Sequence, residues 1–239
     1  MAVGSKRRNK QKDGNMIKLT EATLKFLGNL KLNNNREWFN DNKADYERAK
    51  SEFINFVDGL IIRISEFDED IRHQTARDTV FRIFRDVRFS ADKAPYKTHL
   101  GAYISASKSK SDIHSYAGYY IHIEPSGESM LAGGAYMPQG PWLKNIRKEI
   151  HYNGDEFRSI IGHETFTKTF GEMEGEKLKT SPRDYPNDHR DIELLKYKSF
   201  LAVHKCSDKL IISDGFAEHS AKVFSYLYPF NRFLNHARE

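Results

Sequence analysis

The chain has 239 residues, with 38 Lys and Arg against 33 Asp and Glu, 13% aromatic residues and one cysteine. This length suits one large domain or two small ones, and the aromatic content supplies a hydrophobic core, which excludes wholesale disorder. A single cysteine excludes a disulfide scaffold and any Cys-based zinc site, and is typical of the reducing cytosol. No apolar run approaches the ~18 residues of a membrane-spanning helix, and the first residues lack the apolar stretch of a secretory signal. We therefore expect a globular cytoplasmic protein with no membrane partner.

Most of the net charge of +5 belongs to residues 1–15. Five basic residues less Asp13 give this segment +4, which leaves about +1 for residues 16–239. Because the segment is polar and has no periodic apolar positions, we predict a disordered basic tail followed by a single α+β domain over residues 16–239. The net charge is therefore no evidence that the folded part binds nucleic acid, which we expect to bind only through the tail.

Apolar residues recur at helical spacing in two N-terminal segments. Thr20 is placed to cap the first helix, which carries leucines from 24–30 on one face. Three asparagines at 33–35 break this helix and can cap the next one. The second pattern predicts one long amphipathic helix over roughly residues 36–66, which ends in the acidic stretch at 66–70.

Residues 82–99, which we call the basic segment, are dominated by basic side chains. They hold Arg82, Arg85, Arg88, Lys93 and Lys97 against Asp86 and Asp92. The apolar residues of the basic segment fit a helical face and a strand equally well. Pro95 requires an extended backbone just before it, so we expect a short strand that enters an irregular turn.

Alternating residues rich in Tyr and Ile predict strands at 98–106 and 116–125. The Ser- and Lys-rich loop between them indicates an antiparallel pair. A third strand follows at 128–138, where Gly133 and Gly134 permit a bulge or a close approach of another segment.

The C-terminal half returns to helices. Pro141 starts a helix that Gly154 closes, and a second helix or turn follows at 155–161. A strand lies within 194–206, and Ser213 caps a last helix. Because the strands arrive as consecutive hairpins without alternating helices, we expect an α+β fold. Its central, mostly antiparallel sheet carries N-terminal and C-terminal helices.

Two interpretations of the basic segment remain open. In the first, it binds a phosphate-bearing or other anionic small molecule, because a planar guanidinium matches a phosphate group. Arg85 and Arg88 then bind the anion through their forked guanidinium groups, and Lys93 adds a point charge. Tyr96 donates a hydrogen bond from its hydroxyl, and Asp86 orients the arginines. The residues predicted to bind are Arg82, Arg85, Asp86, Arg88, Asp92, Lys93, Tyr96 and Lys97.

In the second interpretation, Asp86 is the hub of an internal salt-bridge network. The protein is then a non-catalytic structural or interaction domain whose basic tail contacts nucleic acid or an acidic partner. The cations outnumber the carboxylates, so a wholly internal network leaves at least three cations without a partner. If the first interpretation, anion binding, includes chemistry, Asp86 or His122 accepts the proton. The sequence decides neither enzymatic activity nor reaction type, ligand or oligomeric state.

His122 and Glu124 share one face of a predicted strand, at a spacing that offers two metal ligands. Further ligands would have to come from Asp188, His189 or Asp191. A polar strand face explains the pair equally well, so we predict no metal site, and the sequence implies no cofactor.

Two other residues have a simple structural interpretation. The aspartates beside His189 could orient a general base, but a loop that caps the following helix explains them more simply. Cys206 is expected to be a buried small apolar side chain rather than a nucleophile.

The basic segment, RIFRDVRFSADKAPYK, resembles the signature of an uncharacterised bacterial and fungal family, domain of unknown function 2461. The family pattern is approximately Arg-x-x-Arg-Asp-x-Arg-Phe-x-x-Asp/Asn-Lys-x-x-Tyr. Its fixed positions are matched by Arg82, Arg85, Asp86, Arg88, Phe89, Asp92, Lys93 and Tyr96. The resemblance implies a family without an established activity, so it supplies no substrate, cofactor or catalytic residue.

Other blocks extend the resemblance over about residues 20–235. They are FLGNLKLNNNREWFNDNKADY at 26–46, GYYIHIEP at 118–125, LAGGAYMP at 131–138, and LKTSPRDYPNDHRDIELLKYKSF at 178–200. One departure is Arg190, where members often carry Pro after the histidine. The role of His189 therefore stays open.

Overall fold

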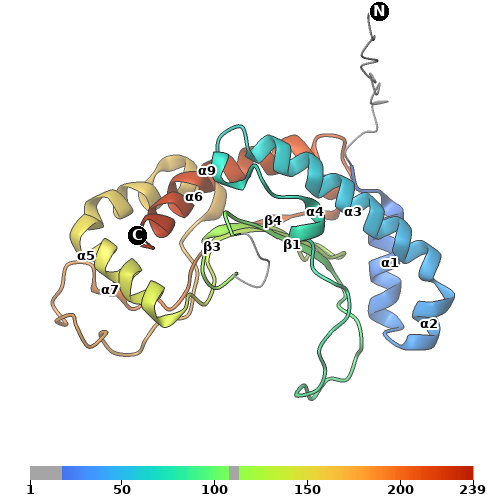
Figure 1. Cartoon of the computed structure of the whole chain (residues 1–239), viewed down its shortest axis with the longest axis horizontal. Coiled ribbons are helices and arrows are strands. Elements are labelled where there is room, and N and C mark those ends of the chain that lie inside the picture. Colours follow the sequence, from blue (N-terminus) through green and yellow to red (C-terminus); the bar gives the residue numbers. More distant parts are fainter. Residues whose placement is uncertain (1–17, 108–112, 239) are drawn as a thin grey trace, which may run out of the picture.

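A four-stranded antiparallel sheet lies at the centre of the computed structural model, which describes residues 18–107 and 113–238. The strands are β1 (Leu100–Ile104), β2 (Gly118–Ile123), β3 (Ser129–Ala135) and β4 (Phe200–Cys206), in the order β1-β2-β3-β4. Each strand pairs with the next strand along the chain, and helices flank the sheet (Figure 1), so the predicted α+β fold is confirmed. The tail predicted at 1–15 and part of the loop after β1 lie outside the described residues.

Long helices lie along one side of the sheet (Figure 1). They are α3 (Lys43–Ile64) and α9 (Phe216–His236), and α1 (Glu21–Leu32) packs against α3. Phe56 of α3 stacks on Phe216 of α9 with 5.1 Å between ring centroids. Gly133 of β3 lets α9 come close, because a Cβ at this position would lie 2.8 Å from Leu227. The apolar residues on this side of the strands are therefore buried beneath the two helices.

The single helix predicted over 36–66 is wrong, because the structure contains two helices. They are α2 (Arg36–Asp41) and α3, and Asn42 lies between them. The Asn42 side chain donates to the carbonyl of Trp38 at 2.8 Å, so it satisfies a carbonyl at the end of α2. Asn35 caps α2 as predicted, but the hydroxyl of Thr20 donates to Glu52 of α3 instead of capping α1.

In the C-terminal half, helix α5 (Gly140–Gly162) has a kink at Asn153, where the backbone is not helical. The kink lies one residue from the break predicted at Gly154 and joins the predicted helix to the second helix predicted at 155–161. Gly154 lets the Asp191 side chain come close to α5, because a Cβ at this position would lie 2.5 Å from a carboxylate oxygen of Asp191. The N-cap of α9 is Gly215, while the Ser213 hydroxyl donates to the preceding turn. The shorter helices are η1 (Glu69–Ile71), α4 (Ala76–Thr79), α6 (Glu164–Phe170), α7 (Ile192–Leu195) and α8 (Asp208–Ile211).

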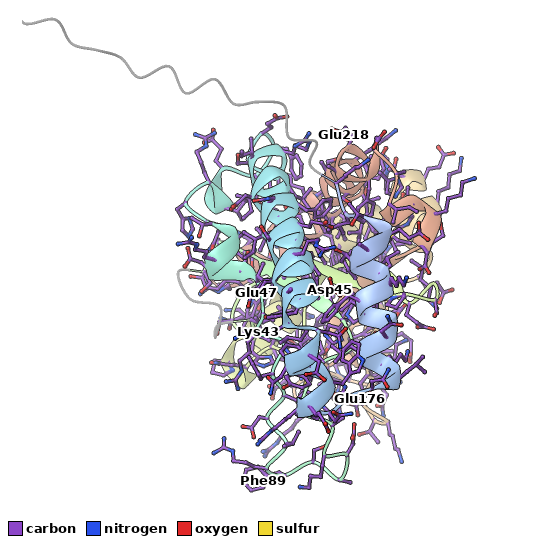
Figure 2. The ribbon with its side chains drawn as sticks, turned by 90° about the vertical axis from the view of Figure 1, so that its right-hand side faces the viewer. Lys43, Asp45, Glu47, Phe89, Glu176 and Glu218 are labelled. Carbon is purple, nitrogen blue, oxygen red and sulfur yellow. The ribbon has the colours of Figure 1, made fainter. Side chains whose placement is uncertain are left out.

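Residues 80–99, which we call the arm, run out from the sheet and back (Figure 1). The two halves are joined at Phe84 and Tyr96, and Lys97 donates its backbone N–H to the carbonyl of Ile83 at 2.8 Å. Phe89 lies at the far end of the arm (Figure 2) and is 96% exposed. The backbone is therefore extended, as expected, and not helical. None of the helices in the described part of the chain is both long and apolar enough to cross a membrane.

Candidate functional site

At the tip of the arm, both predicted arginine forks already have a carboxylate partner. Arg88 contacts Asp86 through Nη2, 2.6 Å from Oδ2, and through Nε, 3.0 Å from Oδ1. Arg85 donates to Asp92 at 2.6 Å and to the carbonyl of Ala94 at 3.1 Å. The hydrogen bonds from Arg88 hold the pKa of Asp86 below its ordinary value. These four charged side chains form a network within the arm, on a surface where ion pairs contribute little to stability.

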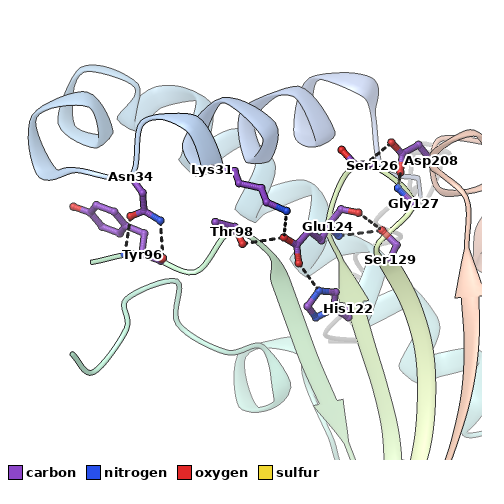
Figure 3. A network of polar contacts seen from close by, with 10 residues as sticks. All are labelled: Lys31, Asn34, Tyr96, Thr98, His122, Glu124, Ser126, Gly127, Ser129 and Asp208. Atoms are coloured by element: carbon purple, nitrogen blue, oxygen red, sulfur yellow. Dashed lines mark hydrogen bonds and ion pairs between the residues drawn. The ribbon is translucent and has the colours of Figure 1, made fainter. Parts of the chain in front are cut away.

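Two further residues of the predicted site make contacts within the protein. The Lys93 ammonium donates to the carbonyl of Val87 at 3.0 Å, which leaves its charge without a carboxylate. Tyr96 is only 5% exposed, and its ring stacks on Phe39 of α2 with 3.9 Å between centroids. Asn34 also bonds the backbone of Tyr96 in both directions, at 2.9 and 3.1 Å (Figure 3). Tyr96 therefore anchors the arm to the N-terminal helices.

The base of the arm holds two cations without a carboxylate partner, Arg82 and Lys97. Neither takes part in an ion pair among the described residues. Lys97 is half-buried, and its ammonium lies 5.1 Å from the ring centroid of Phe81. Burial lowers the pKa of Lys97, and the nearby charge of Arg82 lowers it further. The two cations are therefore close together and form no ion pair among the described residues, although the charge of Arg82 also helps to lower the pKa of Asp86.

Next to Lys97, hydrogen bonds connect side chains of β2 and its neighbours. The Tyr120 hydroxyl lies 2.9 Å from Nδ1 of His122. Nε2 of His122 lies 2.9 Å from Oε2 of Glu124 (Figure 3). The other carboxylate oxygen of Glu124 accepts from Thr98 at 3.0 Å and from Lys31 of α1 at 3.1 Å. Glu124 therefore joins β2, the arm and α1.

His99, at the end of the arm, completes this cluster. Its ring stacks on the His122 ring with 4.1 Å between centroids. Burial, followed by repulsion from His122, lowers the pKa of His99 to about 4. Burial acts to raise the pKa of Glu124, but the hydrogen bonds from His122, Lys31 and Thr98 outweigh it, so this pKa lies below its ordinary value. Near neutral pH, His99 is therefore neutral and Glu124 is ionised.

The charge state of Glu124 fixes the hydrogen positions on His122. An ionised carboxylate can only accept, so Nε2 of His122 carries the hydrogen and Nδ1 is free to accept from Tyr120. Burial raises the pKa of Tyr120 to about 12, so its hydroxyl stays protonated. An imidazole oriented by a carboxylate is the usual arrangement of a general base. Here the Tyr120 hydroxyl donates the hydrogen bond to the other nitrogen of the imidazole.

Lys97 is a neighbour of the hydrogen-bonded cluster, and Arg82 lies close enough to Lys97 to lower its pKa. The charge of Lys97 lowers the pKa of His99, and the Phe81 ring near Lys97 lies 6.5 Å from the Tyr120 ring. We call this group the base-of-arm site. It consists of Arg82, Lys97, His99, Tyr120, His122 and Glu124.

A family model with the description "Conserved hypothetical protein (DUF2461)" matches residues 22–233. The chain belongs to the DUF2461 family. The match spans the arm, the sheet and most of α9, and it confirms the resemblance carried by the basic segment. Comparison with curated proteins and comparison with solved structures gave no match.

In this DUF2461 protein, His189 belongs to a different part of the fold from His122. Its Nε2 lies 2.7 Å from Nδ1 of His151 on α5, and its Nδ1 accepts the backbone N–H of Asp191 at 2.9 Å. Asp191 itself pairs with Arg158. The group that could hold a metal with His122 and Glu124 contains His99, not the predicted Asp188, His189 or Asp191.

Sequence reasoning missed four members of the cluster, which are Lys31, Thr98, His99 and Tyr120. Tyr120 precedes His122 by two residues on a predicted strand, so the alternation of β2 was a usable signal for it. The other three come from α1 and the arm, and only tertiary packing brings them to Glu124.

The DUF2461 fold also contains a groove of about 820 Å³ beside α5 and α9, and no residue of the arm lines it. Acidic and basic side chains share its wall, among them Asp68, Glu149 and Arg232. Asn231, 2% exposed, donates to the carbonyl of Gly118 at 3.1 Å, while its side-chain oxygen has no hydrogen-bond partner among the described residues. No feature of the sequence indicated this groove.

Proposed function

We propose that this protein binds a phosphate-bearing or other anionic small molecule at the base-of-arm site. The observation that carries the proposal is a pair of cations without an ion-pair partner among the described residues, Arg82 and Lys97, of which Lys97 lies beside the Tyr120–His122–Glu124 cluster. Arg82 supplies the planar donor fork that matches phosphate, and Lys97 supplies a point charge. Lys97 is half-buried, so an anion at its ammonium compensates a charge that has partly lost its water.

This proposal changes the roles that the basic segment suggested. Arg85 and Arg88 have aspartate partners at the tip, so we assign these four residues to the shape of the arm. Arg82 and Lys97 take over the contacts with the anion. Tyr96 and Lys93 hold the arm in place through the stacking on Phe39 and the bond to the Val87 carbonyl.

Of the two candidate proton acceptors, the geometry favours His122. Arg88 lowers the pKa of Asp86, and a carboxylate with a lowered pKa is a weaker base. His122 has its Nε2 hydrogen bonded to Glu124, which orients the ring and leaves Nδ1 as the acceptor. We infer that any proton transfer to or from the bound anion passes through His122 and Tyr120.

Thermal unfolding with inorganic phosphate, pyrophosphate and a panel of phosphorylated metabolites tests the proposal. A ligand that binds only the folded state stabilises it by about 2.7 kcal/mol at about 100 times its dissociation constant. We expect this stabilisation in the wild type and in Arg88→Gln, whose side chain lies at the tip. Lys97→Met and Arg82→Gln should lose it.

The matched variants separate the alternatives. Loss of the response in Arg88→Gln, with a normal response in Lys97→Met, would place the ligand at the tip and overturn the base-of-arm assignment. If no anion stabilises the wild type and the arm variants only lose stability, the charged residues are an internal network and nothing more.

A further inference from the structure

Three potential metal ligands meet on the opposite edge of the sheet from the arm. They are His204 and Cys206 of β4 and His219 of α9. Their ligand atoms all lie within 4.8 Å of one another. Cys206 is buried, and the two histidines are half-buried, so solvent reaches the cluster from the histidine side.

The two imidazoles point their Nε2 atoms at each other. These atoms are 3.1 Å apart, and the ring planes are inclined by 41°. Nδ1 of His204 lies 3.0 Å from the carbonyl of Thr169 in α6. A carbonyl can only accept, so Nδ1 carries the hydrogen and Nε2 presents a lone pair. Histidines that bind metals are usually held in this way, with the second ring nitrogen donating to a carbonyl or carboxylate.

We propose that His204, Cys206 and His219 bind a divalent transition metal of the zinc class. Two imidazole nitrogens and one thiolate suit Zn²⁺, which binds His at ~2.0–2.1 Å and Cys at ~2.3 Å in tetrahedral geometry. Two nitrogens bound to one tetrahedral Zn²⁺ lie about 3.3–3.4 Å apart, close to the 3.1 Å observed between the Nε2 atoms. The thiol gives up its proton to the solvent on binding, and water supplies the fourth ligand.

A simpler explanation accounts for part of the cluster. His219 can donate from Nε2 to the lone pair of His204, and that hydrogen bond needs no metal. This hydrogen bond does not involve Cys206, whereas the metal site requires the thiolate of Cys206. The proposal departs from the expectation that a single cysteine excludes any Cys-based zinc site, because a mixed site with two histidines needs only one cysteine.

The chain contains a matched control for this distinction. His151 and His189 form a second imidazole pair, with 2.7 Å between Nδ1 and Nε2, and no cysteine is part of it. If paired imidazoles alone bound the metal, both pairs would bind it. If the thiolate is a ligand, only the His204–His219 pair forms a strong site.

Cobalt titration of the untagged full-length protein tests the proposal. Co²⁺ replaces Zn²⁺ in such sites and reports thiolate ligation through a sulfur-to-cobalt charge-transfer band. We expect the wild type and His151→Asn to bind one Co²⁺ with this band, and Zn²⁺ to displace it. Cys206→Ala should lose the band. His219→Asn should bind at least about tenfold more weakly, because the loss of a ligand costs no less than the loss of an outer-shell partner of a ligand.

Other results would overturn the site. A wild type that shows no charge-transfer band with saturating Co²⁺ has no thiolate ligand. If the wild type and His219→Asn bind Co²⁺ with equal affinity, the histidine pair is not part of the site. Should Cys206→Ala fail to fold, His219→Asn carries the test, because its side chain is only half-buried and circular dichroism can verify its fold.

Discussion

Glu124 collects hydrogen bonds from three separate segments of the chain. Its donors are His122 on β2, Thr98 in the arm and Lys31 on α1. The Glu124 side chain is only 14% exposed, so its bonds to His122 and Thr98 are largely shielded from water, whereas the Lys31 ammonium is half-exposed. Glu124 therefore has two roles, because it orients the His122 ring and fastens the base of the arm to the rest of the protein.

Replacement of this carboxylate should be costly. We expect Glu124→Gln to lower the free energy of unfolding by about 1–3 kcal/mol, because the amide nitrogen cannot accept and leaves a donor unpaired. Urea unfolding measures the difference. Lys31→Met is the matched control, since its half-exposed ammonium forms an ion pair worth at most about 1 kcal/mol. Equal losses in the two variants would contradict the central position of Glu124.

The lowered pKa of His99 makes stability depend on pH. Between its ordinary value of 6.5 and its value of about 4 in the fold, the unfolded chain binds a proton that the folded protein does not. The contribution of His99 is therefore complete above pH 6.5 and is lost as the pH falls toward 4. With allowance for solvent screening, we expect about 1–2 kcal/mol less stability at about pH 5 than at about pH 7.5.

Urea unfolding of the wild type and His99→Asn at both pH values isolates this effect. The variant should show a smaller loss on acidification, because other histidines titrate equally in both proteins. The lowest pH is kept above the range in which Glu124 takes up a proton. Identical losses in the two proteins would mean that His99 is not shielded from protonation.

The members of the cluster differ in how far the sequence predicts them. Tyr120, His122 and Glu124 alternate along a strand that the sequence predicts, so their shared face follows from the strand. His99 joins them through the register of β1 and β2, which pairs Leu100 with Ile123 and so brings His99 beside Glu124. A register is a property of the folded sheet, and this is why the sequence offered His189 as a partner of His122 in place of His99.

At the scale of elements, hydrogen-bonding side chains decide boundaries that apolar periodicity leaves open. The periodicity of 36–66 continues across Asn42, yet the Asn42 side chain bonds the Trp38 carbonyl and divides the segment into α2 and α3. In α5 the kink at Asn153 lies next to Gly154, where the absent side chain leaves room for Asp191. At both places a contact outside the apolar pattern lies at the break in the helix.

Gly134 of β3 lies where three elements pack closely, and the sequence predicted a close approach of another segment there. Its φ is +114°, and a Cβ there would collide with the Phe200 carbonyl of β4 and lie 2.9 Å from Phe230 of α9. Gly134→Ala should therefore lose about 3 kcal/mol or more of unfolding free energy, from backbone strain and overpacking together.

Gly127→Ala is the control for this substitution. Its φ of +75° imposes a similar backbone strain, but a Cβ there would meet nothing within 4 Å. We expect a loss of only about 1–2 kcal/mol in chemical denaturation. A Gly134→Ala protein no less stable than Gly127→Ala would show that β3, β4 and α9 are not closely packed at this position.

At the scale of the whole molecule, the sheet separates two kinds of environment. α3 and α9 bury one side of it, while the base-of-arm site lies where the arm, β2 and α1 meet (Figures 1 and 3). The order of hairpins was enough to predict this α+β class. The pairing of charges within the arm was not predictable, because it depends on which of seven charged side chains face one another across the turn.

The whole-molecule distribution of charge separates the two interpretations of function. Residues 1–15 carry +4 of the net +5, so a protein that begins at Met16 keeps the base-of-arm site but has a net charge of about +1. We expect this truncated protein to keep the full stabilisation by phosphate, because Arg82 and Lys97 are unchanged. Binding to nucleic acid, which rests on released counterions, should weaken in the truncated protein and depend less on salt.

Thermal unfolding with phosphate and salt-dependent binding of duplex DNA measure the two responses. Loss of the phosphate response on truncation would favour the interaction domain, with the tail as its contact and the arm as an internal ion network.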